Sequence, residues 1–257
     1  MLLTVDIGNS HITLGVYDGE LMRCVARVVT DPRLTEDQYA IEFGEVLDLY
    51  RVDRKEITGA AISSVVPELT VTISEAIRKS IGVQVVIVGP GVKTGLNIRI
   101  DNPAQLGADL VAGAVAAVAR FPMPCLVFDM GTATSITVLD KNGCLLGVSI
   151  CAGVGIMLEA LFSRTALLPH VNIEMPASPI GKNTVHSMQS GLIYGTAAMM
   201  DGMAERMEEI LGSPATLVAT GGLAKKILPA CKRKFIHCDH LLLDGLRLIY
   251  EKNIKQQ

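Results

Sequence analysis

Residues 2–19 of the chain read LLTVDIGNSHITLGVYDG, and residues 125–143 read CLVFDMGTATSITVLDKNG. Each stretch is an apolar run that ends in Asp-x-Gly, then a second apolar run, then an Asp-Gly or Asn-Gly turn. Aligning Asp6 with Asp129 places Gly8 on Gly131, and the later turns fall one residue out of step. Apolar runs joined by such turns predict β-hairpins. The repeat, about half a chain apart, predicts two similar α/β domains with a cleft between them.

The segments around the two hairpins predict further helices and strands. Thr35 and Gln38 have the spacing of a helix capping box. Apolar runs at 59–66, 83–88 and 215–219 predict buried strands. One helix is expected from Pro103 to Arg120, with Asn102 as its N-cap, and a long one from Thr184 to Leu211, closed by Gly212. We expect the domains to span residues 1–118 and 119–257.

The composition indicates a globular protein and argues against nucleic-acid binding and membrane insertion. Of the 257 residues, 49% are apolar and 19% are charged, which is typical of a globular protein. A net charge of -3 without a long basic run argues against nucleic-acid binding. The apolar run 110–119 is too short to span a membrane, and the start of the chain lacks the pattern of a signal peptide. Six cysteines without a C-x-x-C pair predict free thiols in the cytoplasm.

The Asp-x-Gly turns carry chemistry that suits a polyphosphate. Glycine and small polar residues in tight turns expose backbone N–H donors to an anion. The carboxylate before each turn, Asp6 or Asp129, is suited to a metal ion or its waters. One such turn alone is more often an ordinary β-turn, whereas two at equivalent places indicate a phosphate site. Gly221-Gly222, between a predicted strand and helix, would suit adenosine or ribose.

Four motifs then make the chain resemble the type III pantothenate kinases, within the actin-like ATPase superfamily. They are residues 6–10 (DIGNS), 107–109 (GAD), 129–134 (DMGTAT) and 181–184 (GKNT). The resemblance extends in order over nearly the whole chain. It implies duplicated ribonuclease-H-like domains and ATP-dependent phosphorylation of pantothenate to 4′-phosphopantothenate, the first step of coenzyme A biosynthesis. It also implies ATP with Mg²⁺, a monovalent cation (K⁺ or NH₄⁺), and a homodimer.

The resemblance also implies roles for individual residues. Asp109 would be the general base that orients the attacking hydroxyl. Asp129 would hold the monovalent cation, and Asp6 would hold Mg²⁺ through water. The residues expected to bind ATP are Asp6, Ile7, Gly8, Asn9, Ser10, His11, Ile12, Thr13, Thr132, Gly221 and Gly222. Those expected to bind the acceptor are Ile100, Gly107, Ala108, Asp109, Leu110 and Thr184.

Two positions depart from the family pattern on the acceptor side. Leu110 stands where relatives have an arginine, and Ile100 stands where they have an aromatic residue. A leucine cannot replace a permanently charged, bidentate guanidinium. Either another cation such as Arg99 or Lys182 binds pantothenate, or the acceptor is a different hydroxyl compound. A third hypothesis is that the protein is a catalytically weak nucleotide-binding regulator.

Overall fold

The computed structural model describes residues 1–254, which form two compact units. The first unit contains residues 1–96, 101–116 and the chain from Leu241, and the second contains residues 97–100 and 117–240. The expected boundary between residues 118 and 119 lies inside helix α3 (Ala108–Arg120). The C-terminal helix α7 (Leu241–Ile254) belongs with the first unit. The chain therefore leaves the first unit and returns to it.

The first unit is built on a five-stranded mixed sheet in the order β3-β2-β1-β4-β5. Its strands are β1 (Leu2–Ile7), β2 (His11–Asp18), β3 (Leu21–Val29), β4 (Gly59–Ser64) and β5 (Val85–Ile87). β1 pairs antiparallel with β2 and parallel with β4, and β4 pairs parallel with β5. The carboxyl ends of β1 and β4 therefore lie at the same edge of the sheet.

The second unit repeats this sheet strand for strand, in the order β8-β7-β6-β9-β10. Its strands are β6 (Cys125–Met130), β7 (Ala133–Leu139), β8 (Leu145–Ala152), β9 (Thr216–Thr220) and β10 (Ile236–His237). Asp6 lies opposite Thr13 and Ser63, and Asp129 lies opposite Ser135 and Thr220. The repeat predicted from the two Asp-x-Gly stretches is confirmed, and the fold is a duplicated ribonuclease-H-like α/β fold.

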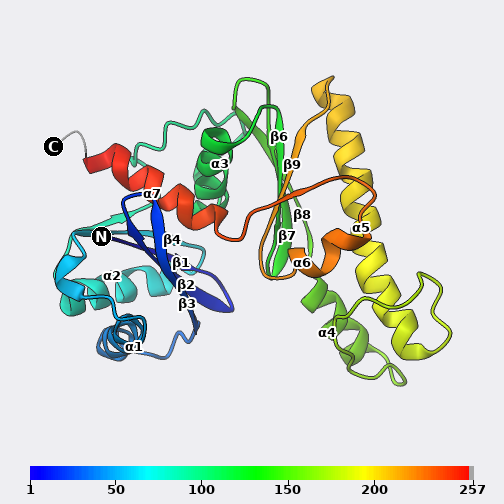
Figure 1. Cartoon of the computed structure of the whole chain (residues 1–257), viewed down its shortest axis with the longest axis horizontal. Coiled ribbons are helices and arrows are strands. Elements are labelled where there is room, and N and C mark those ends of the chain that lie inside the picture. Colours follow the sequence, from blue (N-terminus) through cyan, green and yellow to red (C-terminus); the bar gives the residue numbers. More distant parts are fainter. Residues whose placement is uncertain (255–257) are drawn as a thin grey trace. The chain divides into compact units, whose positions relative to one another are not determined.

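Side chains of β1 alternate between two differently covered faces of the first sheet. Leu3, Val5 and Ile7 enter a core formed with α1 (Glu36–Leu49) and α2 (Pro67–Ile81). Helix α7 covers the opposite face (Figure 1). There the Tyr17 hydroxyl, on β2, donates to Asp244 Oδ1 at 2.7 Å. The C-terminal helix thus completes the burial of the N-terminal sheet.

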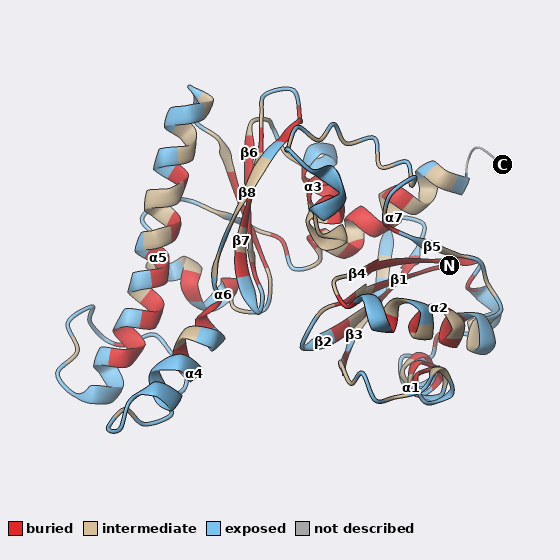
Figure 2. Ribbon diagram, turned by 180° about the vertical axis from the view of Figure 1, so that it is seen from behind, coloured by how far each residue is buried: buried red, intermediate tan, exposed pale blue. Residues whose placement is uncertain are grey.

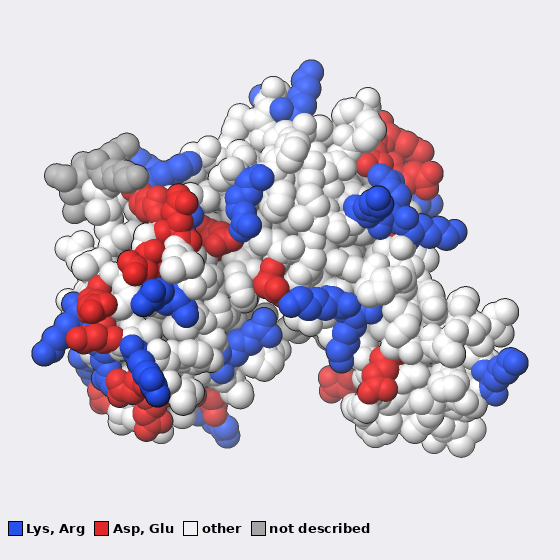
Figure 3. Space-filling view, in the orientation of Figure 1, with Lys and Arg blue, Asp and Glu red and all other residues white. Residues whose placement is uncertain are grey.

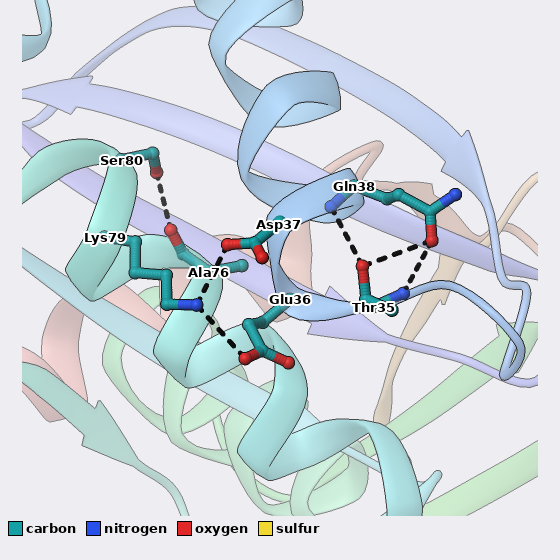
Figure 4. Close-up of polar contacts among 7 residues, drawn as sticks. All are labelled: Thr35, Glu36, Asp37, Gln38, Ala76, Lys79 and Ser80. Carbon is teal, nitrogen blue, oxygen red and sulfur yellow. Dashed lines mark hydrogen bonds and ion pairs between the residues drawn. The ribbon is translucent and has the colours of Figure 1, made fainter.

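The predicted capping box at the start of α1 is confirmed. Thr35 Oγ1 accepts a hydrogen bond from Gln38 N, and Gln38 Oε1 accepts one from Thr35 N at 2.9 Å (Figure 4). In the same first turn of α1, Glu36 and Asp37 form ion pairs with Lys79 of α2 at 3.1 and 2.9 Å (Figure 4). Acidic residues in a first helical turn also complement the positive end of the helix dipole. These contacts fix the start of α1 against α2.

The helices of the second unit pack on the apolar face of its sheet. They are α4 (Val154–Arg164), α5 (Thr184–Leu211) and α6 (Ala224–Ile227). α5 begins and ends where the sequence predicted, and Gly212 closes it in the left-handed conformation with φ 68°. Its buried stripe includes Leu192, Ile193 and Met200 (Figure 2). Three short 3₁₀ helices, at Arg54–Glu56, Pro103–Gln105 and Leu228–Ala230, complete the secondary structure of residues 1–254.

The single helix expected from Pro103 to Arg120 is wrong. Asn102 caps only the 3₁₀ turn Pro103–Gln105, and its Oδ1 accepts from Ala104 N at 3.2 Å. Leu106 then takes an extended conformation, with φ -72° and ψ 126°, so the helical hydrogen bonds cannot continue. α3 starts again at Ala108, which puts Asp109 in the first turn of a helix rather than inside one.

Surface charge is mixed on the face drawn in Figure 3. Basic and acidic side chains are scattered among uncharged residues, and the area over α4 and the start of α5 carries few charges (Figure 3). Exposed apolar residues occur in that part of the chain: Ile156, Leu161, Phe162, Leu167, Ile180 and Val185. Within residues 1–254, we find no helix with the length and apolar character that crossing a bilayer requires.

Candidate active site

The β1–β2 turn presents backbone at the edge of the first sheet. Gly8 N donates to His11 O at 3.0 Å, which closes the turn over Asn9 and Ser10. Thr30 Oγ1 donates to Gly8 O at 2.7 Å and holds the turn from β3's end. The turn is therefore ordered by its own contacts, as a phosphate-binding loop requires.

Asp6 precedes this turn by two residues and is half-buried at the end of β1. The Ser63 hydroxyl on β4 donates to Asp6 Oδ1 at 2.6 Å. Their side chains meet because the two residues are register partners on parallel strands. An oriented carboxylate beside a phosphate-binding turn fits Mg²⁺ or its waters, since Mg²⁺ prefers oxygen ligands and keeps several waters.

Asp109 lies at the same edge of the first unit. The segment before α3 reaches it through Gly107, whose Cβ position is 3.7 Å from Val65 Cγ1. Val65 N in turn donates to Ile7 O, the last residue of β1. Asp109 Oδ1 accepts from Leu110 N at 2.8 Å. Burial raises the pKa of Asp109 and outweighs the lowering effect of the backbone hydrogen bonds to it.

In the second unit, a turn and a helix start meet at the end of β6. Gly131 N donates to Ala133 O at 3.0 Å, so the β6–β7 turn is one residue shorter than the β1–β2 turn. Gly153, the N-cap of α4, packs on this turn: a Cβ there would overlap Thr132 O and lie 2.6 Å from Gly131 O. The N-terminal N–H groups of α4 therefore lie beside the turn, where a phosphate would be favoured.

The third glycine turn lies at the same edge. Gly221 follows β9 with φ 91°, a conformation that favours glycine, and its Cβ position is 2.6 Å from the Met130 carbonyl. Thr220 is the register partner of Asp129, and Asp129 Oδ1 lies 4.0 Å from the Cβ position of Gly131. The structure thus gathers Asp129, the Thr132 turn and the Gly221-Gly222 turn at one edge of the second sheet.

The other residues predicted to bind ATP differ in exposure, and those predicted to bind the acceptor belong to different units. Ile7 and Ile12 are buried, so only their backbone can face a nucleotide, whereas Asn9, Ser10 and His11 are exposed and Thr13 lies beside Asp6. Gly107, Ala108, Asp109 and Leu110 are consecutive at the start of α3. Ile100 and Thr184 belong to the second unit, where Thr184 opens α5 after the Asn183 N-cap. The sequence motifs missed Ser63, Thr30 and Gly153.

The two cationic residues proposed to bind the acceptor, Arg99 and Lys182, are both exposed. Arg99 is exposed, and its charge contributes to lowering the pKa of Asp140, after the stronger effect of the hydrogen bond from Cys144 N. Lys182 is exposed in the segment before α5. Leu110, half-buried beside Asp109, adds no charge to the start of α3.

Comparison with known proteins gives consistent results. The profile of the family described as type III pantothenate kinase matches residues 2–206. Proteins of that name from Moorella thermoacetica and Brevibacillus brevis are 41% and 42% identical to the chain. Each alignment covers 98% of this chain and at least 99% of the relative. Among solved structures, an activator of 2-hydroxyisocaproyl-CoA dehydratase from Clostridium difficile, with bound ADPNP, matches with a TM-score of 0.57 at 16% identity. That alignment covers 99% of this chain and 96% of the other.

Proposed function

The chain belongs to the type III pantothenate kinase family, and we propose from this premise how its two sheet edges carry out the reaction. The protein phosphorylates pantothenate with ATP and a divalent metal, in coenzyme A biosynthesis. In this reaction the acceptor hydroxyl oxygen forms a bond to the γ-phosphorus. The bond from that phosphorus to the β–γ bridging oxygen breaks, and ADP leaves.

Asp109 is the residue that receives the hydroxyl proton in our proposal. The observation that carries it is the half-buried carboxylate in the first turn of α3, at the edge where β1 ends. Burial favours the protonated form, so the carboxylate binds a proton more readily than an exposed aspartate would. A base of this kind contributes typically 10²–10⁴-fold to the rate.

The two glycine turns would bind the phosphates of ATP. Gly131, Thr132 and the first N–H groups of α4 suit one end of the chain of phosphates, and Gly8 to Ser10 suit the other. The Gly221-Gly222 turn would receive the adenosine. A bound Mg²⁺ would neutralise negative charge on the β- and γ-phosphates. Asp6, oriented by Ser63, is the residue we assign to it.

Three finer features belong to the same proposal. Asp129, at the edge of the second sheet, would hold a monovalent cation, K⁺ or NH₄⁺.

The exposed apolar residues of α4 and the segment before α5 would be covered by a second copy of the chain, giving a homodimer. Gly191 and Gly195, exposed on α5 with open space at their Cβ positions, would allow close approach. None of the six cysteines is joined in a disulfide within residues 1–254, which suits the cytoplasm.

The test is ADP release that depends on the acceptor. Purified protein with ATP, Mg²⁺ and K⁺ is given pantothenate or one of a panel of hydroxy acids and sugars. Asp109→Asn should lower kcat with pantothenate by about 10²–10⁴-fold. Asp101→Asn is the matched control, because Asp101 is an exposed aspartate shortly before α3. Full activity of Asp109→Asn would remove Asp109 from the mechanism.

A further inference from the structure

Asp6 and the C-terminal helix lie on the same face of the first sheet. Leu2, Thr4 and Asp6 alternate with the core residues of β1, so they point to the face that α7 covers. Their register partners on β2 and β4, which share this face, include Gly15, Tyr17, Gly59 and Ser63. Figure 1 shows α3 and α7 next to each other on that side of the sheet.

α7 is fixed on this face by contacts that leave little freedom. The Tyr17 side chain is 1% exposed, and its hydroxyl donates to Asp244 Oδ1 at 2.7 Å. Leu243 Cδ1 lies 2.9 Å from the Cβ position of Gly15, and the Tyr250 ring occupies the space where a Cβ of Gly59 would be. Two strand glycines thus admit side chains of α7 against the sheet backbone.

Gly245 of α7 touches α3, the helix that carries Asp109. A Cβ on Gly245 would overlap the carbonyl oxygen of Ala112 and lie 2.5 Å from its carbon. Both atoms are backbone, so they cannot yield as the end of a flexible side chain would. Ala112 is three residues after Asp109 on α3, which places this contact within one helical turn of the carboxylate.

We propose that Gly245 is a positioning residue, and that its backbone contact with Ala112 fixes Asp109 relative to Asp6 and the β1–β2 turn. The proposal rests on the proposed role of Asp109 as the base. α7 is held by Tyr17 on the sheet side and touches α3 on the other, so it sets the spacing between the sheet and α3. Phosphoryl transfer depends on such spacing, because a misplacement of about 1 Å can cost about 10²-fold in rate.

Gly245→Ala tests the contact directly. The added methyl should push α3 away from α7 and lower kcat by about 10–100-fold, while the KM for ATP stays within about threefold. Gly113→Ala is the matched control: it adds the same methyl to α3, where a Cβ would meet open space. Alanine in a helix interior is otherwise favoured over glycine, so the control should keep full activity.

A double-mutant cycle separates positioning from a general loss of structure. If Gly245 acts through Asp109, then Gly245→Ala should cause no further loss of kcat in the Asp109→Asn background. An equal loss in both backgrounds would overturn the proposal, as would full kcat of Gly245→Ala alone. If Asp109→Asn itself keeps wild-type kcat, the proposed function fails instead, so the two failures are distinguishable.

Tyr17→Phe is the second variant, for use if Gly245→Ala does not fold. It removes the hydrogen bond to Asp244 without adding atoms, so α7 loses one anchor and keeps its packing. We expect a fall in kcat of several-fold, an unchanged KM for ATP, and no further loss when combined with Asp109→Asn. An unchanged kcat of Tyr17→Phe, or a loss that persists in the Asp109→Asn background, would overturn the proposal.

Discussion

At the scale of the residue, Asp109 is less stable in its ionised form than an exposed aspartate would be. Its folded-state pKa is raised by burial, so the folded protein binds this proton more tightly than the unfolded chain does. Ionisation therefore weakens the folded state as pH rises from the unfolded-state pKa through the raised one. Below both values the group is protonated in both states, and this effect disappears.

A stability measurement follows from that sign. Asp109→Asn should raise Tm at pH 7–8, and the gain should vanish below pH ~4, near the ordinary pKa of aspartate. The asparagine oxygen can still accept from Leu110 N, so the helix start is retained. Thermal unfolding followed by circular dichroism across pH checks this, with Asp101→Asn as the exposed control. A gain that persists at pH 3 would contradict the assignment of the effect to ionisation.

Leu110 gives a second prediction at this scale. Leu110→Arg places a guanidinium beside Asp109, and a charge-assisted hydrogen bond to the carboxylate of pantothenate contributes about 1.5–3 kcal/mol. The KM for pantothenate should fall about tenfold or more, with kcat changed little. Leu110→Met is the uncharged control and should leave KM unchanged. If Leu110→Arg also leaves KM unchanged, the carboxylate is bound elsewhere.

The candidate site residues that the sequence proposed lie within short local motifs, whereas contacts made by strand pairing or packing were not predicted. Asp6 and Gly8 belong to one short motif, and so do Gly107 and Asp109. Ser63 meets Asp6 only because β1 and β4 pair in parallel with that register. Gly153 meets Thr132 only after the chain has passed through β7 and β8. No spacing within a single motif carries that information.

At the scale of the element, two helix ends predicted from local caps are confirmed, whereas Asn102 caps only a 3₁₀ turn. The Thr35 capping box and the Gly212 stop of α5 were both correct, because each is decided by a few adjacent residues. The break at Leu106, strand β8, and helices α4 and α7 were not predicted. No cap or turn motif in the sequence marks these features.

The capping box predicts a measurable contribution to stability. Thr35→Ala removes the acceptor for Gln38 N and should lower the free energy of unfolding by about 1 kcal/mol. Thr35→Ser keeps an acceptor oxygen and should stay within about 0.5 kcal/mol of the wild type. Urea unfolding of the three proteins checks this. Equal loss in both variants would mean that the threonine methyl group, rather than the hydrogen bond, stabilises α1.

At the scale of the whole molecule, the duplicated sheet was predictable from the repeated Asp-x-Gly stretches. The proposed homodimer has its own test. Ile180→Glu puts a charge in the exposed apolar segment before α5 and should shift sedimentation from dimer towards monomer. Leu49→Glu on α1 is the matched control, since Leu49 is 77% exposed and Ile180 is 76% exposed. A monomeric wild type, or an unchanged dimer in Ile180→Glu, would contradict this interface.

The return of α7 to the first unit also determines the order in which the protein can fold during synthesis. The ribosome completes β1 to β5 early, yet one face of that sheet acquires its cover only when the last helix emerges. Until then Tyr17 has no Asp244 to receive its hydrogen bond, and Gly59 has no Tyr250 above it. Domains that are continuous in sequence can fold as they leave the ribosome, N-terminal first. Here the first unit to be synthesised is the last to be finished, and the second sheet can form while the first still waits for its final helix.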